Sequence, residues 1–343
     1  MYDYGVIVED LLQWYDENAR ILPWRSEPKP YYIWVSEIML QQTRVEAVKG
    51  YFARFIKELP DVAALASVEE DVLLKLWEGL GYYNRARNLQ VAAKTIMEEY
   101  GGEIPKDYEK LQKLKGIGSY TAGAIASIAY GIPVPAVDGN VLRVMKRLSG
   151  SYDDIIKASV KKELEKELTK IMPKRSGAFN QAVMDLGAMV CIPNGRPLCE
   201  ECPLKKHCIA YKKDIVMELP VKTPKKKRRI EEKTILVLEY EGKFALHKRE
   251  DKGLLAGLWE FPNIPGKLEA NSLEEIVKDE NYIVRALGES KHIFTHLEWH
   301  MTGYHIQLNQ KPDKDYIWIS AEELVGNYAI PTAFSAYVKR IFG

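Results

Sequence analysis

Apolar residues recur at two different spacings in the two parts of the chain. From residue 7 to residue 190 they follow the 3.6-residue period of amphipathic helices. Three later segments are short, rich in β-branched and aromatic residues and separated by turn residues, which is typical of strands: 234–240, 243–249 and 301–308. The pattern predicts a multi-domain chain, with an all-helical domain followed by an α+β domain.

Residues 217–233 separate the two patterns. This segment contains two prolines and six basic residues between Lys222 and Arg229, and no apolar period runs through it. We therefore expect domains at 1–216 and 234–343, joined by a basic linker. The linker either contacts phosphate or is a solvated tether. If the linker contacts phosphate, the salt dependence of polyanion binding should become shallower when Lys225, Lys226 and Lys227 are replaced by alanine.

Composition and charge narrow the class of protein. The 343 residues are 46% hydrophobic and 28% charged, a globular balance. No uncharged apolar stretch approaches ~18 residues, and the acidic N-terminus is unlike a secretory signal, so we expect a soluble cytoplasmic protein. Residues 1–230 carry 36 basic against 30 acidic side chains, and residues 231–343 carry 13 against 18. A basic part joined to an acidic part weakly favours a nucleic-acid partner for the first.

All four cysteines fall within 18 residues. Their spacing is C-x7-C-x2-C-x5-C, formed by Cys191, Cys199, Cys202 and Cys208. Four thiolates on one short segment can surround a tetrahedral metal ion or a cubane iron–sulfur cluster, and two disulfides or inert thiols are the alternative. The uneven spacing departs from the paired C-x2-C of zinc sites and favours iron–sulfur.

A glycine turn joins two helical patterns at residues 114–122. Gly116 and Gly118 flank one apolar residue, so the turn can direct backbone N–H groups towards a phosphate, or it is a plain helix–helix turn. About twenty residues later, Asp138 precedes another helical pattern. An aspartate there is usually an N-cap.

These features together resemble a known family. The chain is similar to the helix–hairpin–helix DNA glycosylases that carry an iron–sulfur loop, and within them to the MutY family of adenine DNA glycosylases. The resemblance covers nearly the whole chain, with one departure: the first cysteine spacer has seven residues where the family usually has six. It rests on LPWR (22–25), SEIMLQQTRVEAV (36–48), LWEGLGYYNRARNL (76–89), LKGIGSYTAGAIASIA (114–129), VDGNVLRV (137–144), FNQAVMDLGAMVC (179–191) and the cysteine loop.

The resemblance implies removal of adenine mispaired with 8-oxoguanine or guanine in duplex DNA, by a monomer holding a [4Fe–4S] cluster on the four cysteines. Such chemistry needs an acid for the base and a carboxylate facing the sugar cation. By resemblance these are Glu37 and Asp138, with Asn140 positioning Asp138. The apolar neighbours of Glu37 should raise its pKa, unless it is a solvated glutamate at a helix start.

Tyr120 occupies the position where the related endonuclease III branch has a lysine that forms a Schiff base. A tyrosine cannot do this, and by resemblance it hydrogen-bonds the catalytic carboxylate. We therefore expect base removal without efficient strand cleavage. A silent lesion binder and a redox-sensing DNA binder are the alternatives from other classes, and the two carboxylates argue against both.

The resemblance also assigns contacts to the DNA. The adenine must leave the helical stack to be cleaved. Pocket contacts fall on Trp24, Arg25, Leu40 and Gln181, although Trp24 and Leu40 could equally be core. Residues that probe or wedge the duplex are Gln42, Thr43 and Tyr82, and Tyr82 could instead be a half-buried aromatic.

Residues 234–343 resemble the Nudix-like C-terminal domain of the family, which recognises 8-oxoguanine. The acidic run at 271–280 lacks the arginine and spacing of a magnesium-binding Nudix helix, so we expect recognition and not hydrolysis. The family's Phe-Ser-His loop reads here as Phe294, Thr295 and His296. A loop that only packs is the alternative.

Overall fold

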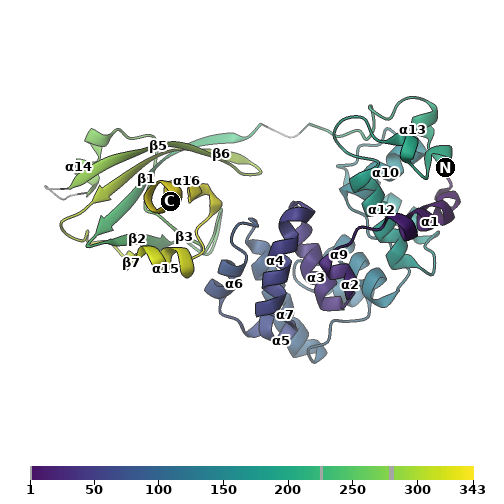
Figure 1. The fold of residues 1–343 in the computed structure, drawn as a ribbon, viewed down its shortest axis with the longest axis horizontal. Helices are drawn as coiled ribbons and strands as arrows, with labels where there is room; N and C mark the ends of the chain where they lie inside the picture. Colours follow the sequence, from purple (N-terminus) through teal and green to yellow (C-terminus); the bar gives the residue numbers. More distant parts are fainter. Residues whose placement is uncertain (1, 225–226, 278–281) are drawn as a thin grey trace. The chain divides into compact units, whose positions relative to one another are not determined.

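A computed structural model describes residues 2–224, 227–277 and 282–343. Lys225 and Lys226 of the basic linker, and the last three residues of the acidic run at 271–280, lie outside the described residues. The described chain forms two compact units, one of residues up to 67 with 87–224, the other of 68–86 with 227–343 (Figure 1). In the described part, no helix is long and apolar enough to cross a membrane.

The first unit is helical, as predicted. Its elements are η1 (Tyr4–Ile7), α1 (Val8–Asn18), α2 (Pro23–Ser26), α3 (Pro30–Leu40), α4 (Val45–Glu58), α5 (Val62–Ser67), most of α7 (Asn84–Tyr100), α8 (Tyr108–Lys113), α9 (Ser119–Ala124), η2 (Ile125–Ala129), α10 (Gly139–Ser149), α11 (Ala158–Thr169), α12 (Ser176–Met189), η3 (Cys199–Glu201), η4 (Lys205–His207) and α13 (Ile209–Lys212). Helix α9 continues into η2, which is a π-helical turn.

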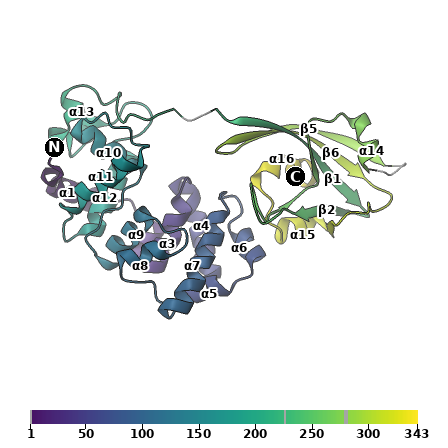
Figure 2. The ribbon, with the colours of Figure 1, turned by 180° about the vertical axis from the view of Figure 1, so that it is seen from behind.

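Two groups of helices make up this unit. One core joins α1 to α10, α11, α12 and the cysteine loop, so the start of the chain packs on its later helices. In the other group α3 contacts α4, α9 and η2, and α8 lies beside α9 (Figure 2). Helix α3 is buried on nearly every side, which explains why its sequence is apolar with little amphipathic period.

The second unit is a curved mixed sheet with helices, together with one helix from early in the chain. Its elements are α6 (Glu70–Leu76), β1 (Arg229–Tyr240), β2 (Lys243–Lys248), β3 (Trp259–Glu260), β4 (Asn263–Pro265), η5 (Ala270–Ser272), α14 (Glu274–Val277), β5 (Ile283–Ile293), β6 (Leu297–Gln307), β7 (Ile317–Ile319), α15 (Ala321–Gly326), η6 (Thr332–Phe334) and α16 (Ser335–Phe342). The strand order is β3-β2-β1-β6-β5, with β4 on β1 and β7 on β2.

Alternating residues of β1 feed a core on each face of this sheet. Ile235 and Val237 pack on the side of α16, whereas Leu236 and Leu238 pack towards η5 and α14. Helix α16 lies in the concave face (Figure 1). It approaches β6 closely, because a Cβ on Gly303 would stand 2.1 Å from the Tyr337 ring.

The structure differs from the sequence pattern at three places. Strand β1 begins at Arg229, inside the segment expected to be linker. Strand β5 was not predicted, because it is an edge strand with mostly exposed residues and therefore shows little apolar alternation. Residues 68–86, which have a helical pattern, group with the second unit. There, Lys75 Nζ donates to Tyr328 O at 3.0 Å and Ile330 N donates to Glu78 Oε1 at 2.9 Å.

Candidate active site

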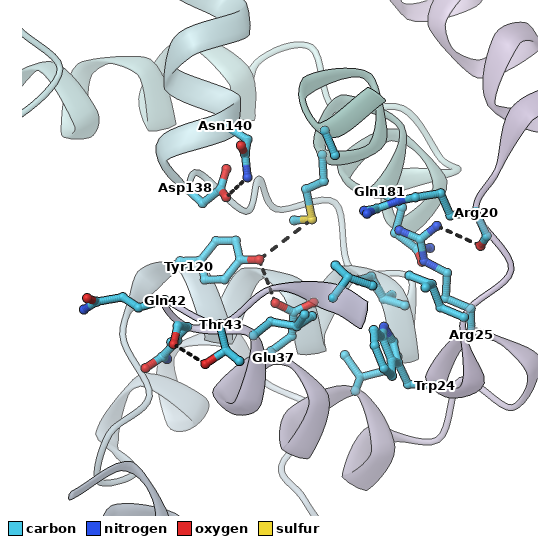
Figure 3. A pocket seen from close by; sticks show the side chains of 18 residues that line it. Arg20, Trp24, Arg25, Glu37, Gln42, Thr43, Tyr120, Asp138, Asn140 and Gln181 are labelled. Atoms are coloured by element: carbon cyan, nitrogen blue, oxygen red, sulfur yellow. Dashed lines mark hydrogen bonds between the residues drawn. The ribbon is translucent and has the colours of Figure 1, made fainter. Parts of the chain in front are cut away.

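Glu37 lies in the second half of α3, inside the protein. Pro30 starts this helix at its first position, where the missing N–H costs nothing, and most residues that follow are buried. Glu37 is 5% exposed and accepts a hydrogen bond of 2.6 Å from the Tyr120 hydroxyl (Figure 3). It is therefore not a solvated glutamate at a helix start.

The surroundings of Glu37 favour its protonated form. Burial and, to a smaller extent, the nearby Asp138 carboxylate raise the pKa of Glu37 to about 7. The Tyr120 hydrogen bond, Arg25 and Arg20 act in the opposite direction on this pKa. Burial also raises the pKa of Tyr120 well above its ordinary value, so Tyr120 remains a hydrogen-bond donor. The predicted direction for Glu37 is confirmed, and the group can hold a proton near neutral pH.

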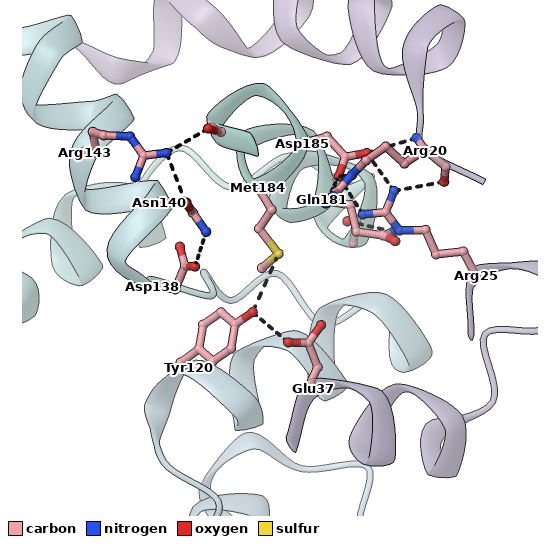
Figure 4. A network of polar contacts seen from close by, with 12 residues as sticks. Arg20, Arg25, Glu37, Tyr120, Asp138, Asn140, Arg143, Gln181, Met184 and Asp185 are labelled. Carbon is pink, nitrogen blue, oxygen red and sulfur yellow. Dashed lines mark hydrogen bonds and ion pairs between the residues drawn. The ribbon is translucent and has the colours of Figure 1, made fainter. Parts of the chain in front are cut away.

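Asp138 is both the N-cap of α10 and a wall of the same pocket. Its carboxylate accepts 2.8 Å hydrogen bonds from the Val141 backbone N and from Asn140 Nδ2, and Arg143 Nη2 donates to Asn140 Oδ1 at 3.0 Å (Figure 4). Burial raises the pKa of Asp138, while the bonds from Val141 and Asn140 and the Arg143 charge oppose that rise. The carboxylate that accepts these bonds is thus the better of the two at keeping its charge.

One pocket of about 560 Å³ brings these groups together, a size typical of small-molecule sites. Ten of the predicted site residues line it: Trp24, Arg25, Glu37, Leu40, Gln42, Thr43, Tyr120, Asp138, Asn140 and Gln181. They come from α2, α3, α9, α10 and α12 and from the turn after α3 (Figure 3). Arg20 and Met184 also line the pocket, although they were not predicted from the sequence. Their positions could have indicated them, because Arg20 lies just before the LPWR motif and Met184 lies three residues after Gln181 on the same helix face.

Trp24 is core and pocket wall at once. It is 3% exposed and its ring meets Phe52 edge-on at 5.4 Å, yet it lines the pocket. Gln181 is held by a 3.3 Å hydrogen bond from its Nε2 to Gly177 O. Trp24 therefore gives the cavity a flat aromatic wall, and Gln181 gives the same cavity a polar amide group.

Two predicted duplex-probing residues have a backbone conformation that side chains rarely adopt. Gln42 has φ of 59° and Tyr82 has φ of 48°. Non-glycine residues with a strained, left-handed backbone conformation are concentrated at functional sites. Tyr82 is 48% exposed, whereas its neighbour Tyr83 is 5% exposed, so only Tyr83 is an ordinary buried aromatic.

The glycine turn lies apart from the residues that line this pocket. Gly116 has φ of +80°, and a Cβ there would stand 2.9 Å from Asn88 Cβ, so only glycine fits without a shift. Gly118 caps α9 with φ of −92° and open space around it. The turn is therefore a tight hairpin whose second glycine leaves the start of α9 uncovered.

In the second unit, Phe294, Thr295 and His296 form the tip of the β5–β6 hairpin. Phe294 is half-buried against Trp299, with ring centroids 4.8 Å apart, while Thr295 and His296 are exposed. The Thr295 Oγ1 lies 3.0 Å from the Tyr82 hydroxyl of the same unit. Phe294 anchors the loop, and the two polar residues are presented to solvent.

The four cysteines line one small pocket between the loop and α10 and α12. None of them is in a disulfide. Arg147 Nη1 donates to Cys191 Sγ at 3.3 Å, and apolar side chains of Val144, Leu186 and Val216 complete the wall. Burial raises the pKa values of Cys199, Cys202 and Cys208, so thiolates here need a cationic partner. Within the described ranges no three such side chains are arranged around a single metal ion. Four free thiols that line one largely apolar pocket match the donor chemistry of a thiolate-ligated metal ion or iron–sulfur cluster.

Comparisons with known proteins agree with this architecture. Residues 35–174 match the model of the HhH-GPD superfamily of base excision DNA repair proteins, and residues 234–340 match that of the NUDIX domain. A thermostable thymine-DNA glycosylase (29% identity, TM-score 0.55) and endonuclease III in a non-covalent DNA complex (28%, TM-score 0.53) each align with 61% of this chain, over 96% and 95% of their own. The predicted combination of a helical glycosylase fold and a Nudix-like domain is confirmed.

Curated relatives align with nearly the whole chain. The adenine DNA glycosylase of Mus musculus is 36% identical over 99% of this chain and 78% of its own length. That of Buchnera aphidicola subsp. Schizaphis graminum is 35% identical over 90% of this chain and 91% of its own. Similarity at this level across both units shows that the chain belongs to the adenine DNA glycosylase family.

Proposed function

We propose that this protein removes adenine mispaired with 8-oxoguanine, and less efficiently adenine opposite guanine, from duplex DNA. The observation that carries the proposal is the pair of buried carboxylates, Glu37 and Asp138, lining one pocket with different hydrogen-bond environments. Adenine is inferred as the substrate base from membership of the family. The pocket is large enough for a base that has been turned out of the helical stack.

The environments of the two carboxylates favour different protonation states, and each half of the reaction uses one of them. Glu37 in its acid form donates a proton to N7 of adenine as the bond from N9 to the sugar C1′ breaks. The bonding electrons leave with the base, and positive charge develops on the sugar. Asp138 faces that charge as a carboxylate. Ionised Glu37 then accepts a proton from the water that adds to C1′, which restores the acid.

Release of the base without strand cleavage is part of the proposal. Cleavage through a Schiff base needs a primary amine near C1′. The described residues that line the pocket include no lysine, and Tyr120 instead donates to Glu37. Both observations support a monofunctional glycosylase.

Single-turnover excision on a duplex with one A opposite 8-oxoguanine, and on one with A opposite G, tests the function. Each sample is divided into a heat-only and an alkali-treated portion. We expect product only after alkali, faster on the 8-oxoguanine duplex, and at least about a hundredfold slower with Glu37→Gln. Strand breaks without alkali would indicate a lyase, and tight binding without any product would indicate a silent lesion binder.

The second unit supports recognition of 8-oxoguanine. Thr295 keeps the hydroxyl of the family's loop, lies exposed at the hairpin tip and contacts the hydroxyl of Tyr82. Residues 271–277, the described part of the acidic run, form η5 and the short helix α14. We therefore assign this unit to recognition of the opposite base.

We also propose that Cys191, Cys199, Cys202 and Cys208 hold a [4Fe–4S] cluster. Their shared pocket, free thiols and apolar wall support it. A cluster bound there would cross-link the loop at 199–208 to Cys191, which follows α12 and whose thiol accepts a hydrogen bond from Arg147 of α10, and so stabilise the fold around the site.

A further inference from the structure

Two arginines at the wall of the pocket bind one carboxylate that does not itself line it. Asp185 is fully buried on α12, one turn after Gln181. Its Oδ1 accepts from Arg20 Nε at 2.8 Å and Arg25 Nη2 at 2.9 Å, and its Oδ2 accepts from Arg25 Nη1 at 2.7 Å and from the Arg20 backbone N at 3.1 Å (Figure 4). Each carboxylate oxygen is thus shared by both arginines.

This geometry fixes the orientation of Arg25. A guanidinium bound through two nitrogens to one carboxylate has a single plane and direction, whereas a free arginine samples many rotamers. A further bond of 3.3 Å joins Arg25 Nη1 to Arg20 O. The Arg25 side chain is 13% exposed and lines the pocket beside Gln181. The contacts with Asp185 therefore determine how Arg25 is presented to a base in the pocket.

Asp185 also sets the charge near the acid. Arg20 and Arg25 both act on Glu37 and favour its ionised form, together with the Tyr120 hydrogen bond, while Asp138 opposes them. Arg25 itself faces Asp185, Tyr15 and Glu37. Removing the Asp185 carboxylate would leave two partly buried cations whose effect on Glu37 is uncompensated.

We propose that Asp185 is a positioning residue of this site: it holds the Arg25 guanidinium towards the adenine and offsets one of the two arginine charges so that Glu37 keeps its proton. This inference rests on the proposed function. It gives α12 two tasks, since Gln181 faces the base directly and Asp185 acts through Arg25.

The test compares Asp185→Asn with the wild-type full chain in single-turnover excision from pH 5 to pH 9. We expect a rate about tenfold to a hundredfold lower at saturating enzyme. The alkaline limb of the profile should also move to lower pH by roughly half a pH unit, the order of effect expected from one uncompensated charge in a partly solvated site. Asp16→Asn is the matched control, because it removes a carboxylate from an exposed pair with Arg175, and should change neither quantity.

A lower fraction of active enzyme with an unmoved alkaline limb would mean that Asp185 only stabilises the fold, and would overturn the proposal. If Asp185→Asn does not fold, Asp185→Glu decides. It keeps the charge but moves the carboxylate, so the rate should fall while the limb stays in place, and a wild-type rate would count against positioning.

Failure of the proposed function would be seen separately, as absence of excision by the wild type. The effect of Asp185 on Glu37 is then measured without activity, from the pH dependence of the stability gained on Glu37→Gln with and without Asp185→Asn. A smaller gain near neutral pH in the Asp185→Asn background supports the charge role, and an equal gain rejects it.

Discussion

At the scale of single residues, the main feature of the site is that its two buried carboxyl groups differ in how readily they ionise. Glu37 and Asp138 are both buried, but Asp138 accepts a backbone N–H and an amide whereas Glu37 accepts one hydroxyl. Hydrogen bonds to the ionised form favour ionisation, so similar burial gives two different acids. The same carboxyl group at a helix cap and in a helix interior is therefore suited to different chemistry.

The raised pKa of Glu37 predicts a cost in stability that depends on pH. A carboxyl whose pKa rises from 4.5 to about 7 on folding stabilises the protein only below its unfolded value, and that stability is lost as the pH rises to 7. Glu37→Gln should therefore unfold at a higher denaturant concentration than the wild type at pH 8. The gain should be at most about 3 kcal/mol, and absent near pH 4.

Urea unfolding of both proteins at several pH values measures this difference. Glu46→Gln, which alters an exposed pair with Lys49, is the control and should follow the wild type. Parallel curves for Glu37→Gln and wild type from pH 4 to pH 8 would show that Glu37 ionises normally, and the assignment of Glu37 as the acid would fail.

At the scale of elements, short helices and their ends supply the site. Asp138 starts α10 and Gly150, with φ of 63°, ends it. Helix α12 directs Gln181, Met184 and Asp185 to one side because their spacings of three and four residues repeat the helical turn. A helix is thus an efficient way to place a base contact and the support of a second contact together.

The cysteine loop leads to a prediction about the metal content and stability of the protein. The full chain as purified should contain iron and inorganic sulfide in equal amounts, and Cys202→Ser should lose both and unfold at a lower temperature, because the loop is then no longer cross-linked to Cys191 at the end of α12. Metal and sulfide analysis with thermal unfolding measures these quantities. Zinc in place of iron, or a wild type with no metal and unchanged stability in Cys202→Ser, would contradict the assignment.

At the scale of the molecule, the two units divide the proposed work between excision and recognition. Residues 68–86 carry Tyr82 into the unit of the Thr295 loop, although the chain on either side of them belongs to the first unit. The residue predicted to wedge the duplex and the residue predicted to read the opposite base are thus in contact.

Thr295→Ala should lower the ratio of excision rates for A opposite 8-oxoguanine over A opposite G by about twofold to tenfold, the effect of one lost hydrogen bond. Single-turnover rates on the two duplexes give the ratio. Thr332→Ala alters an exposed threonine in η6 of the same unit and is the control. An equal loss on both duplexes would show that the loop does not discriminate between the opposite bases.

Much of this architecture is present in the sequence. The helical and strand periods predict both fold classes, because burial of one face imposes its spacing on the chain. The motif resemblance also predicts ten of the residues that line the pocket, the first being Trp24 and the last Gln181. Strand β5 escapes the same reasoning, since an exposed edge strand needs no apolar period.

The sequence by itself determined which residues are proposed to carry the chemistry, because Glu37, Tyr120, Asp138 and the four cysteines stand in recognisable local patterns. Only the tertiary structure decided their state. The pKa of Glu37 depends on burial by helices far away in the sequence, and Asp185 meets Arg25 across 160 residues. Local spacing cannot encode such contacts, because they arise only when separate helices pack against one another.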